Sequence, residues 1–293
     1  MGYSLHPSFA RNYQLCDELG SGGYGFVMTA VHQIEQVEVA VKFVIKDKVP
    51  KEAWVTDEVF GRLPMEVMLL MMVNHGNIVK CLDVYEDELY FYPLPFLDVP
   101  SRPQYCRRPS HDLFECIEQT KHKRLSEKQA RYIMSQVVDA VHYLKNQGIS
   151  HRDIKDENLV VDRDLRVKLI DFGSATIVDP SFPRPYYKLF FGTTAYASPE
   201  ILQKKPYQAE PAEVWTLGVL MSYLLTGMSP FPSENDALEG RIVLSEVPGK
   251  RLSKSCLHMM ARCLEPDPTR RATIEEVREH RWLRGSESAV GRH

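Results

Sequence analysis

The strongest constraint on the fold is a change of pattern at residues 93–109, a stretch rich in proline and arginine. Before it, residues 13–45 have the pattern of paired strands around a glycine-rich turn, and further strand-like runs lie near residues 78–85 and 89–92. Residues 64–73 predict one buried helix. After the break, helical periodicity is expected over residues 113–121, 127–147, 212–225, 254–264 and 273–282. The sequence therefore predicts a small β-rich lobe followed by a larger helical lobe.

Composition and charge argue against several classes of function. The 293 residues are 44% hydrophobic and 26% charged, with a formal net charge of −3. This balance gives no sign of a nucleic-acid partner, and no apolar stretch is long enough to span a bilayer. The six cysteines lack Cys-x-x-Cys spacing, so we expect neither a metal site nor a disulfide framework built on them. A reducing cytoplasmic or nuclear location fits this pattern.

Two carboxylates and an amide follow one another at short spacing in the helical part. Asp153 is followed five residues later by Asn158, and Asp171 opens the run Asp-Phe-Gly thirteen residues after that. Phosphoryl transfer from ATP needs one carboxylate that orients the attacking hydroxyl and accepts its proton, and it needs a carboxylate and an amide that hold Mg²⁺ on the phosphates. Each residue alone has the simpler interpretation of a surface polar group. Together they predict Asp153 as the base and Asn158 with Asp171 as magnesium ligands.

A glycine-rich pattern, Gly-x-Gly-x-x-Gly-x-Val, occupies residues 20–27. Glycines let a backbone turn tightly and approach phosphates without a Cβ in the way. A single match is equally the pattern of an ordinary hairpin turn. Lys42 favours the nucleotide interpretation, because it ends an apolar run on the next strand and a buried ammonium needs a partner. The residues predicted to contact the nucleotide are Gly20, Ser21, Gly22, Gly23, Tyr24, Gly25, Val27, Ala40 and Lys42.

The charged partners expected for Lys42 are the α- and β-phosphates and a glutamate on the helix of the first lobe. Glu66 lies in the apolar run Pro-Met-Glu-Val-Met-Leu-Leu, whose neighbours would bury one helix face and turn the glutamate inward. Glu58 is the alternative, in a more polar segment without that periodicity. The pattern favours Glu66.

The motifs above resemble those of the eukaryotic protein kinases, and this resemblance implies that the segment joining the two lobes crosses the edge of the adenine. Pro93 and Pro95 have no N–H to donate there, so the register decides the number of adenine hydrogen bonds. If Tyr92 guards the back of the pocket, Pro95 falls at the donor position and one bond is lost. If Pro93 guards it, the N–H of Phe96 supplies the bond. Leu94 and Phe96 are the predicted contacts, and both registers stay open.

These motifs resemble the catalytic, magnesium and glycine-rich loops of the eukaryotic protein kinases in residue type, spacing and order. Within the calmodulin-dependent-kinase-like group, the sequence most resembles the PIM kinases and the catalytic domain of PAS-domain kinase. This similarity is carried by the runs PMEVMLL, HDLFECIE and HRDIKDENLVVD. The resemblance implies an α+β bilobal protein-kinase fold. It places the kinase domain at residues 13–284, with lobes over 13–95 and 96–284 and tails over 1–12 and 285–293.

The resemblance also implies roles for further residues. Lys155 would neutralise the transferring phosphoryl group, in the position where Ser/Thr kinases carry a lysine. Thr193 resembles the threonine that bonds the catalytic aspartate and lysine of those kinases. Asp112 is expected to contact the ribose or a basic substrate residue, Glu157 to lie at the same site, and Val160 to lie beneath the adenine.

In the second lobe, Glu200 and Arg271 match the family's usual buried ion pair. Two other features of this lobe depart from the family pattern. Glu213 stands where the family carries an aspartate that braces the catalytic loop, so one extra methylene has to be accommodated. Residues 97–111 look like an insertion, and its three arginines either grip an acidic partner or belong to a solvated loop.

A third departure lies between the Asp-Phe-Gly run and Glu200. No serine or threonine comes just before Phe190, where many kinases carry an activating phosphothreonine. We therefore expect activity without phosphorylation of this segment, with Leu189, Phe190 and Phe191 packing it in place of a phosphate.

The implied function is transfer of the ATP γ-phosphate to Ser/Thr hydroxyls of protein substrates, with Mg²⁺ as cofactor. Asp156 and Glu157 predict a preference for basic residues upstream of the target, and we expect a monomer with no nucleic-acid and no membrane partner. Two alternatives stay open, an ATP-binding pseudokinase scaffold and a kinase-like fold that phosphorylates a small molecule. The peptide-positioning run over residues 192–200 argues against the second.

Overall fold

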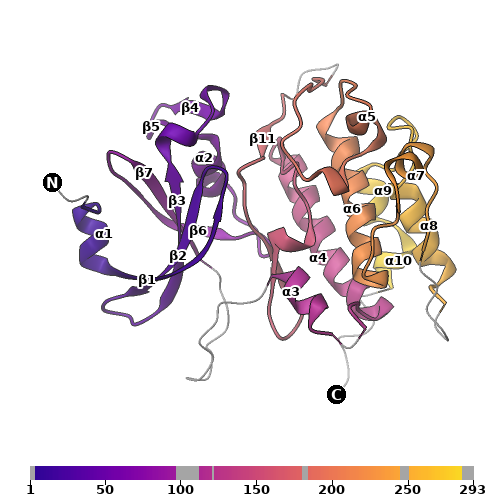
Figure 1. The fold of residues 1–293 in the computed structure, drawn as a ribbon, viewed down its shortest axis with the longest axis horizontal. Coiled ribbons are helices and arrows are strands. Elements are labelled where there is room, and N and C mark those ends of the chain that lie inside the picture. Colours follow the sequence, from indigo (N-terminus) through magenta and orange to yellow (C-terminus); the bar gives the residue numbers. More distant parts are fainter. Residues whose placement is uncertain (1–3, 97–111, 121, 180–183, 245–250, 286–293) are drawn as a thin grey trace. The chain divides into compact units, whose positions relative to one another are not determined.

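The computed structural model describes residues 4–96, 112–120, 122–179, 184–244 and 251–285. The chain divides into two compact units, residues 1–103 and 104–293 (Figure 1). The sequence places the lobe boundary between residues 95 and 96, within β7 (Tyr90–Phe96), whereas the division into units falls between residues 103 and 104. The predicted insertion over residues 97–111 lies outside the described residues.

The first unit is built on a five-stranded antiparallel sheet in the order β1-β2-β3-β7-β6. These strands are β1 (Tyr13–Gly22), β2 (Gly25–His32), β3 (Glu38–Ile45), β6 (Lys80–Glu86) and β7 (Tyr90–Phe96). Side chains alternate between the two faces along β3. Val41 and Phe43 join a buried aromatic cluster on one face, so Lys42 lies on the other.

The opposite face of the sheet carries the one α-helix between β3 and β6. Two 3₁₀ turns (Lys46–Lys48 and Lys51–Ala53) and the hairpin of β4 (Trp54–Asp57) with β5 (Gly61–Pro64) lead into α2 (Met65–Met72). Val67 of α2 packs with Leu63, Val44 and Phe91. The helix predicted over residues 64–73 is therefore present, and its apolar residues fix it on the sheet.

Residues 7–12, placed in a tail by the sequence, form helix α1 (Pro7–Asn12). Phe9 is fully buried, and its ring lies edge-on to Tyr92 at 5.3 Å and to Phe43 at 6.5 Å between centroids. The N–H of His6 donates to the hydroxyl of Tyr92 at 2.9 Å. This corrects the expectation of a tail up to residue 12. A six-residue helix that anchors through one aromatic ring leaves no periodic signal in a sequence.

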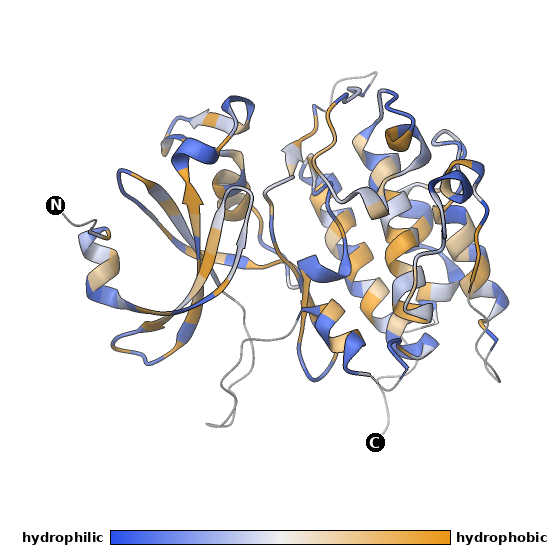
Figure 2. Ribbon diagram, viewed as in Figure 1, coloured by the Kyte–Doolittle hydropathy of each residue, from blue (hydrophilic) through white to orange (hydrophobic). Residues whose placement is uncertain are grey.

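The second unit is mainly helical. Its helices are α3 (Leu113–Glu118), α4 (Glu127–Asn146), α5 (Pro199–Leu202), α6 (Ala209–Thr226), α7 (Glu234–Glu239), α8 (Lys254–Cys263), α9 (Ile274–Arg278) and α10 (Arg281–Arg284). Buried residues occur around the whole circumference of α6, which Figure 2 shows as a strongly apolar helix. A helix that is apolar on all sides is a core helix.

Helix ends in this unit follow local capping. Ser126 and Gln129 form a capping box at the start of α4, and Thr273 and Glu276 form one at the start of α9. The helix predicted over residues 273–282 is two short helices, because the chain restarts at His280, whose ring caps α10. No helix among the described residues has both the length and the apolar composition to cross a membrane.

Two short antiparallel ribbons shape the loops between α4 and α5. One joins β8 (Ile149–Ser150) to β11 (Thr176–Ile177), and the other joins β9 (Leu159–Val161) to β10 (Val167–Leu169). The 3₁₀ turns Asp156–Asn158 and Thr194–Tyr196 complete these loops. The ribbons bring residues 151–158 and 170–173 to the same region of the unit.

Candidate functional site

Lys42 and Glu66 form an ion pair within the first unit. Lys42 projects from β3, and its Nζ donates to Oε1 of Glu66 in the first turn of α2. Glu66 is buried, and a buried carboxylate without a partner would be costly. Glu58, the alternative partner, lies exposed between β4 and β5. The geometry therefore selects Glu66.

The glycine-rich residues 20–25 form the hairpin between β1 and β2, with Tyr24 in its turn. A Cβ added at any of the first three glycines would meet no atom within 4 Å, whereas one at Gly25 would lie 1.8 Å from the carbonyl oxygen of Phe43. Gly25 is therefore required by strand packing. The other glycines leave an exposed backbone that phosphates can approach.

Val27 and Ala40 lie on the same face of the sheet as Lys42. Val27 is the cross-strand partner of Lys42, and Ala40 precedes Lys42 by two residues on β3. Both side chains are half-buried. The structure thus places the predicted apolar contacts next to the lysine on one face of the sheet.

Strand β7 decides between the two registers that the sequence leaves open. Tyr92 is fully buried in the aromatic cluster with Phe43, on the face opposite Lys42. Phe91 packs on the α2 face, so Pro93, two residues later, lies on that face as well. Pro93 is therefore the residue at the back of the Lys42 face.

This register has two consequences for the predicted adenine contacts. Phe96, the last residue of β7, takes the position whose N–H the second register assigns to adenine. Leu94 is fully buried in the aromatic cluster on the opposite face. The group that Leu94 can offer to a nucleotide is therefore its backbone, and the predicted contact stays a prediction.

In the second unit, hydrogen bonds hold both oxygens of Asp153. Oδ1 accepts from the backbone N–H and the hydroxyl of Thr193, at 2.9 and 2.8 Å. Oδ2 accepts from the amide of Asn158 at 3.0 Å, and that amide also donates to the Asp153 carbonyl at 2.8 Å. The carboxylate is therefore fixed in one orientation, as a base that aims at a hydroxyl must be.

Lys155 completes this cluster. Its Nζ lies 2.9 Å from the hydroxyl of Thr193, 3.4 Å from Oδ2 of Asp153 and 3.1 Å from Oε2 of Glu157. Burial of the ammonium group works against ionisation, but Asp153 and Glu157 outweigh it and raise the pKa of Lys155. The lysine is therefore a cation at neutral pH, beside the base.

Asn158 and Asp171 lie at adjacent ends of the β9–β10 ribbon. Leu159 pairs with Leu169, and the N–H of Ile170 donates to the carbonyl of Asn158 at 2.9 Å. Asp171 has a left-handed backbone with φ of 61° and an exposed side chain. The amide nitrogen of Asn158 is committed to the carboxylate of the base, which leaves its oxygen for a cation. An amide oxygen and a carboxylate are oxygen donors that fit Mg²⁺.

Asp112 and Val160 meet at an isolated β-bridge, with Val160 half-buried on β9. The carboxylate of Asp112 caps α3 by accepting from the N–H of Glu115 at 2.7 Å. Burial raises the pKa of Asp112. Asp112 therefore has a structural role in the second unit besides the expected ligand contact.

Asp156 differs from its expected role as a surface charge. It is 6% exposed, and its Oδ1 accepts from the hydroxyl of Tyr196 at 2.8 Å. Burial, followed by the charge of Asp156, raises the pKa of Tyr196. The carboxylate is thus used inside the protein, and Glu157 is the exposed carboxylate of the pair. Tyr196 was not singled out from the sequence, because only the fold brings the two residues together.

Glu213 reaches the catalytic loop in spite of its longer side chain. Its Oε1 accepts from the backbone N–H of His151 at 2.7 Å and of Arg152 at 2.9 Å. The ring of His151 in turn lies 3.0 Å from the Ile170 carbonyl oxygen and packs edge-on against Phe172. Burial raises the pKa of Glu213 to about 7, although the two N–H groups act in the opposite direction.

Glu200 and Arg271 form the predicted buried ion pair. Two guanidinium nitrogens of Arg271 lie 2.8 and 2.9 Å from the two oxygens of Glu200. Arg271 also donates to the carbonyl oxygens of Glu265, Pro211 and Pro266. The pair therefore ties α5 to the first turn of α6 and to the loop between α8 and α9.

Arg152 lies among aromatic rings of the segment before Thr193. Its guanidinium is 5.3 Å from the ring centre of Phe191 and 5.6 Å from that of Tyr187, and its Nε donates to the Ser174 carbonyl at 2.7 Å. These are cation–π distances.

The three apolar residues expected to pack this segment differ in their contacts. Phe190 packs edge-on against Tyr207. Phe191 lies beside Arg152, while Leu189 is 66% exposed. The packing role expected for the Leu189 side chain is therefore corrected.

Comparisons with known proteins agree with this geometry. A model of the protein kinase domain matches residues 13–283. The PAS domain-containing serine/threonine-protein kinase of Mus musculus is 36% identical over 271 residues, 92% of this chain and 18% of that relative. Serine/threonine-protein kinase PSK2 of Saccharomyces cerevisiae is 34% identical over 276 residues, 93% of this chain and 24% of that relative. Serine/threonine-protein kinase pim-2 of Danio rerio is 33% identical over 284 residues, 94% of this chain and 86% of that relative. The chain thus spans less than a quarter of the first two relatives and most of the third, and the resemblance to both groups is confirmed.

Proposed function

The chain belongs to the protein kinase domain family, and from that membership we propose that it transfers the γ-phosphate of ATP to serine and threonine hydroxyls of proteins. The observation that carries the proposal is the carboxylate of Asp153, held by Thr193 and Asn158 with the ammonium of Lys155 3.4 Å away. A base and a cation fixed in this way match a hydroxyl that attacks a phosphoryl group.

Each residue has one task in this reaction. Asp153 orients the substrate hydroxyl and accepts its proton, and Lys155 stabilises the charge on the transferring group. Lys42, oriented by Glu66, holds the α- and β-phosphates under the glycine-rich hairpin. Mg²⁺ held by Asn158 and Asp171 would supply further charge neutralisation on the phosphates.

The test is transfer of labelled γ-phosphate from Mg-ATP to a Ser/Thr peptide library. Wild type is expected to transfer, and Asp153→Asn is expected to be inactive. Asp164→Asn is the matched control, because Asp164 is exposed in the turn between β9 and β10. Intact ATP binding without transfer in the wild type would instead favour the pseudokinase scaffold.

We further propose activity without phosphorylation of the segment before Thr193. Arg152 is supported by the rings of Tyr187 and Phe191, so it is already held without a phosphate. Phosphatase-treated protein, shown by mass spectrometry to be unphosphorylated, should keep its activity. Inactive protein that regains activity on phosphorylation would contradict this proposal.

We propose a preference for basic substrates that rests on Glu157 alone and no longer on Asp156. Glu157 is exposed on the side chain by 53%, whereas Asp156 is used internally. Peptides with arginine upstream of the target should have higher kcat/KM than acidic peptides, and Glu157→Gln should narrow the gap. Equal values for the two peptide sets would argue against it.

A monomer in the cytoplasm or nucleus remains our proposal for the state and location. The five described cysteines are free, which fits a reducing compartment.

A further inference from the structure

The segment before Thr193 depends on the rest of the second unit for its position. The structure describes residues 184–192 in full, and they form no helix or strand. Few hydrogen bonds within the segment therefore keep it folded, and a segment of this kind opens locally at low cost unless other parts of the protein hold it. The contacts that hold it also decide how often Thr193 is placed against Asp153.

Tyr207, in the loop between α5 and α6, contacts this segment in three ways. The backbones of Tyr207 and Tyr187 exchange two hydrogen bonds, of 2.8 and 2.9 Å. The hydroxyl of Tyr207 donates to the carbonyl oxygen of Leu189 at 2.9 Å. Its ring packs edge-on against Phe190, with 6.4 Å between the ring centres. Because Tyr207 is 3% exposed and Leu189 is 66% exposed, a buried side chain holds an exposed stretch of the segment.

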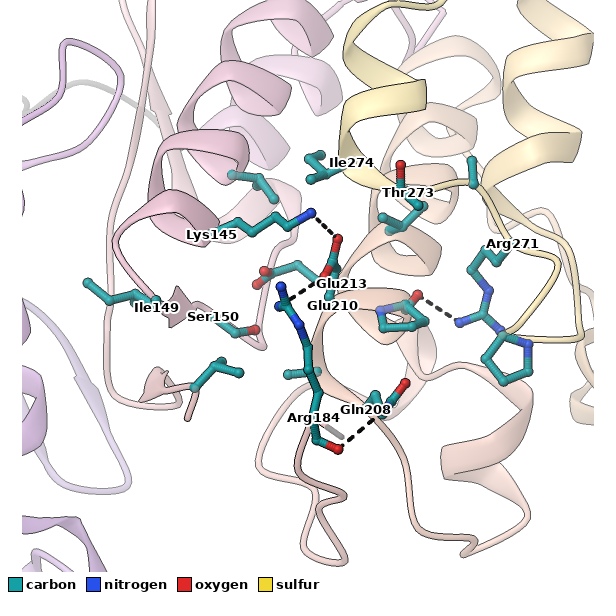
Figure 3. Close-up of a pocket in the computed structure, with 18 of the residues that line it drawn as sticks. Lys145, Ile149, Ser150, Arg184, Gln208, Glu210, Glu213, Arg271, Thr273 and Ile274 are labelled. Atoms are coloured by element: carbon teal, nitrogen blue, oxygen red, sulfur yellow. Dashed lines mark hydrogen bonds and ion pairs between the residues drawn. The ribbon is translucent and has the colours of Figure 1, made fainter. Parts of the chain in front are cut away.

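Gln208 and Glu210, just after Tyr207, attach the start of the segment. Nε2 of Gln208 donates to the carbonyl oxygen of Arg184 at 3.3 Å, and the guanidinium of Arg184 lies 3.2 Å from Oε2 of Glu210 (Figure 3). The side chain of Arg184 is 44% exposed, and an ion pair at the surface contributes little to stability. The start of the segment is therefore attached weakly, and the buried Tyr207 is the stronger attachment.

The stretch that Tyr207 holds leads directly onto the catalytic loop. A Cβ added at Gly192 would lie 2.5 Å from the carbonyl oxygen of Arg152 and 2.8 Å from the ring of Phe190, so the segment passes the loop without room for a side chain. Arg152 is near Tyr207 as well, because its charge acts against the rise that burial causes in the pKa of Tyr207. The residue after Gly192 is Thr193, which fixes the proposed base. The position of Phe190 therefore bears on the position of that base.

We propose that Tyr207 is a positioning residue, which holds the segment before Thr193 on the catalytic loop in the unphosphorylated protein. This inference rests on the proposed phosphoryl transfer and adds a residue that acts on Asp153 through Thr193. The contacts need no phosphate, because a hydrogen bond, a ring pair and a backbone bridge meet at one buried residue. Loss of these contacts should make the segment open more often.

Amide hydrogen exchange, followed by mass spectrometry on the full unphosphorylated chain, measures this opening. The N–H groups of Tyr187 and Thr193 are the reporters, because they donate to Tyr207 and to Asp153 when the segment is folded. Tyr207→Phe removes the hydroxyl and keeps the ring and the backbone bridge. Peptides that contain the two reporters should then exchange about twofold to tenfold faster, the range for one hydrogen bond.

Two control variants separate an effect on the segment from other losses. Tyr186→Phe removes the same hydroxyl from a side chain of the segment that is 64% exposed. Ser222→Ala removes a buried hydroxyl of α6, which donates to the carbonyl oxygen of Met228 at 3.0 Å, so it lowers stability without touching the segment. Neither control should change the exchange of the two reporters. Unchanged exchange in Tyr207→Phe overturns the proposal, and so does an equal effect of either control.

Transfer of phosphate from Mg-ATP to a Ser/Thr peptide tests whether the position of the segment matters for the reaction. Tyr207→Ala removes the ring as well as the hydroxyl, so the segment should be largely open and kcat should fall by about tenfold or more. The affinity for ATP should be unchanged, because Tyr207 acts through Thr193. Tyr207→Phe keeps the ring and should recover most of the lost kcat.

The outcomes distinguish this inference from the proposed function. Rapid exchange in Tyr207→Ala together with the kcat of the wild type would overturn the positioning role. If the alanine variant does not fold, the exchange of Tyr207→Phe decides. A wild type that fails to transfer phosphate contradicts the proposed function instead, because the exchange of Tyr207→Phe is measured without any transfer.

Discussion

Thr193 donates both its backbone N–H and its hydroxyl to the same oxygen of Asp153, at 2.9 and 2.8 Å. The hydroxyl oxygen also accepts from Nζ of Lys155 at 2.9 Å. One side chain therefore sets the position of the proposed base and of the cation that faces the transferring group. Thr193 and Asp153 are 40 positions apart in the sequence. Their hydrogen bonds therefore form only when the segment before α5 is folded onto the catalytic loop.

Thr193→Val removes this hydroxyl and keeps the shape and the backbone donor. A hydrogen bond to a charged group contributes about 1.5–3 kcal/mol, so kcat should fall by about tenfold to a hundredfold. Thr193→Ser keeps the hydroxyl and should stay within about threefold of wild type. Thr194→Val is the control, because Thr194 is exposed. Equal kcat for the valine and serine variants at position 193 would show that the hydroxyl is not used.

The buried pair of Arg271 and Glu200 predicts a large effect on stability. Arg271→Ala leaves a carboxylate buried without a partner and should cost about 3–5 kcal/mol of unfolding free energy. Arg270→Ala is the neighbouring control, because its side chain is 73% exposed, and it should change stability by less than about 0.5 kcal/mol. Urea unfolding of both variants measures the difference. Similar losses in the two would mean that the buried pair contributes little.

Much of the proposed site was predictable because its residues are close in sequence or fixed by secondary structure. Asp153, Lys155 and Asn158 lie in one loop, so their spacing alone brings them together. Glu66 was favoured over Glu58 because an apolar helix turns its polar residue toward a partner, and the ion pair with Lys42 follows that logic.

What the sequence missed depends on long-range packing or on strand faces. The bond between Asp156 and Tyr196 joins residues 40 positions apart, and no local pattern predicts it. The choice between Tyr92 and Pro93 needed the side on which Phe43 packs, which only the sheet shows. Leu189 was expected to pack because it is an apolar residue next to two phenylalanines, but its side chain is exposed.

Helix α1 predicts that residues before the first strand stabilise the first unit. Phe9→Ala removes a fully buried ring from the aromatic cluster and should cost about 3–5 kcal/mol. Arg11→Ala, in the same helix but exposed, should have little effect. Denaturant unfolding followed by tyrosine fluorescence measures both. If the two variants unfold at the same denaturant midpoint, residues 7–12 do not contribute to the stability of the first unit.

Glu213 predicts an unusual dependence of stability on pH. Burial raises its pKa from 4.5 to about 7, so between these values the folded protein keeps a proton that the unfolded chain releases. Stability from this group is therefore fully present below pH 4.5 and is lost as the pH rises through 7. The loss is on the order of 3 kcal/mol.

Glu213→Gln removes this titration and keeps an oxygen for the two N–H groups of the catalytic loop. The variant and the wild type should have similar unfolding free energies at pH 4.5, and the variant should be the more stable protein at pH 8. Urea unfolding at both pH values gives the difference, in which the other titrating groups cancel. Glu234→Gln, at an exposed position, should show no such divergence. The opposite result would be an unfolding free energy of the wild type that rises relative to that of Glu213→Gln as the pH rises. It would show that the two hydrogen bonds stabilise the ionised carboxylate by more than burial destabilises it.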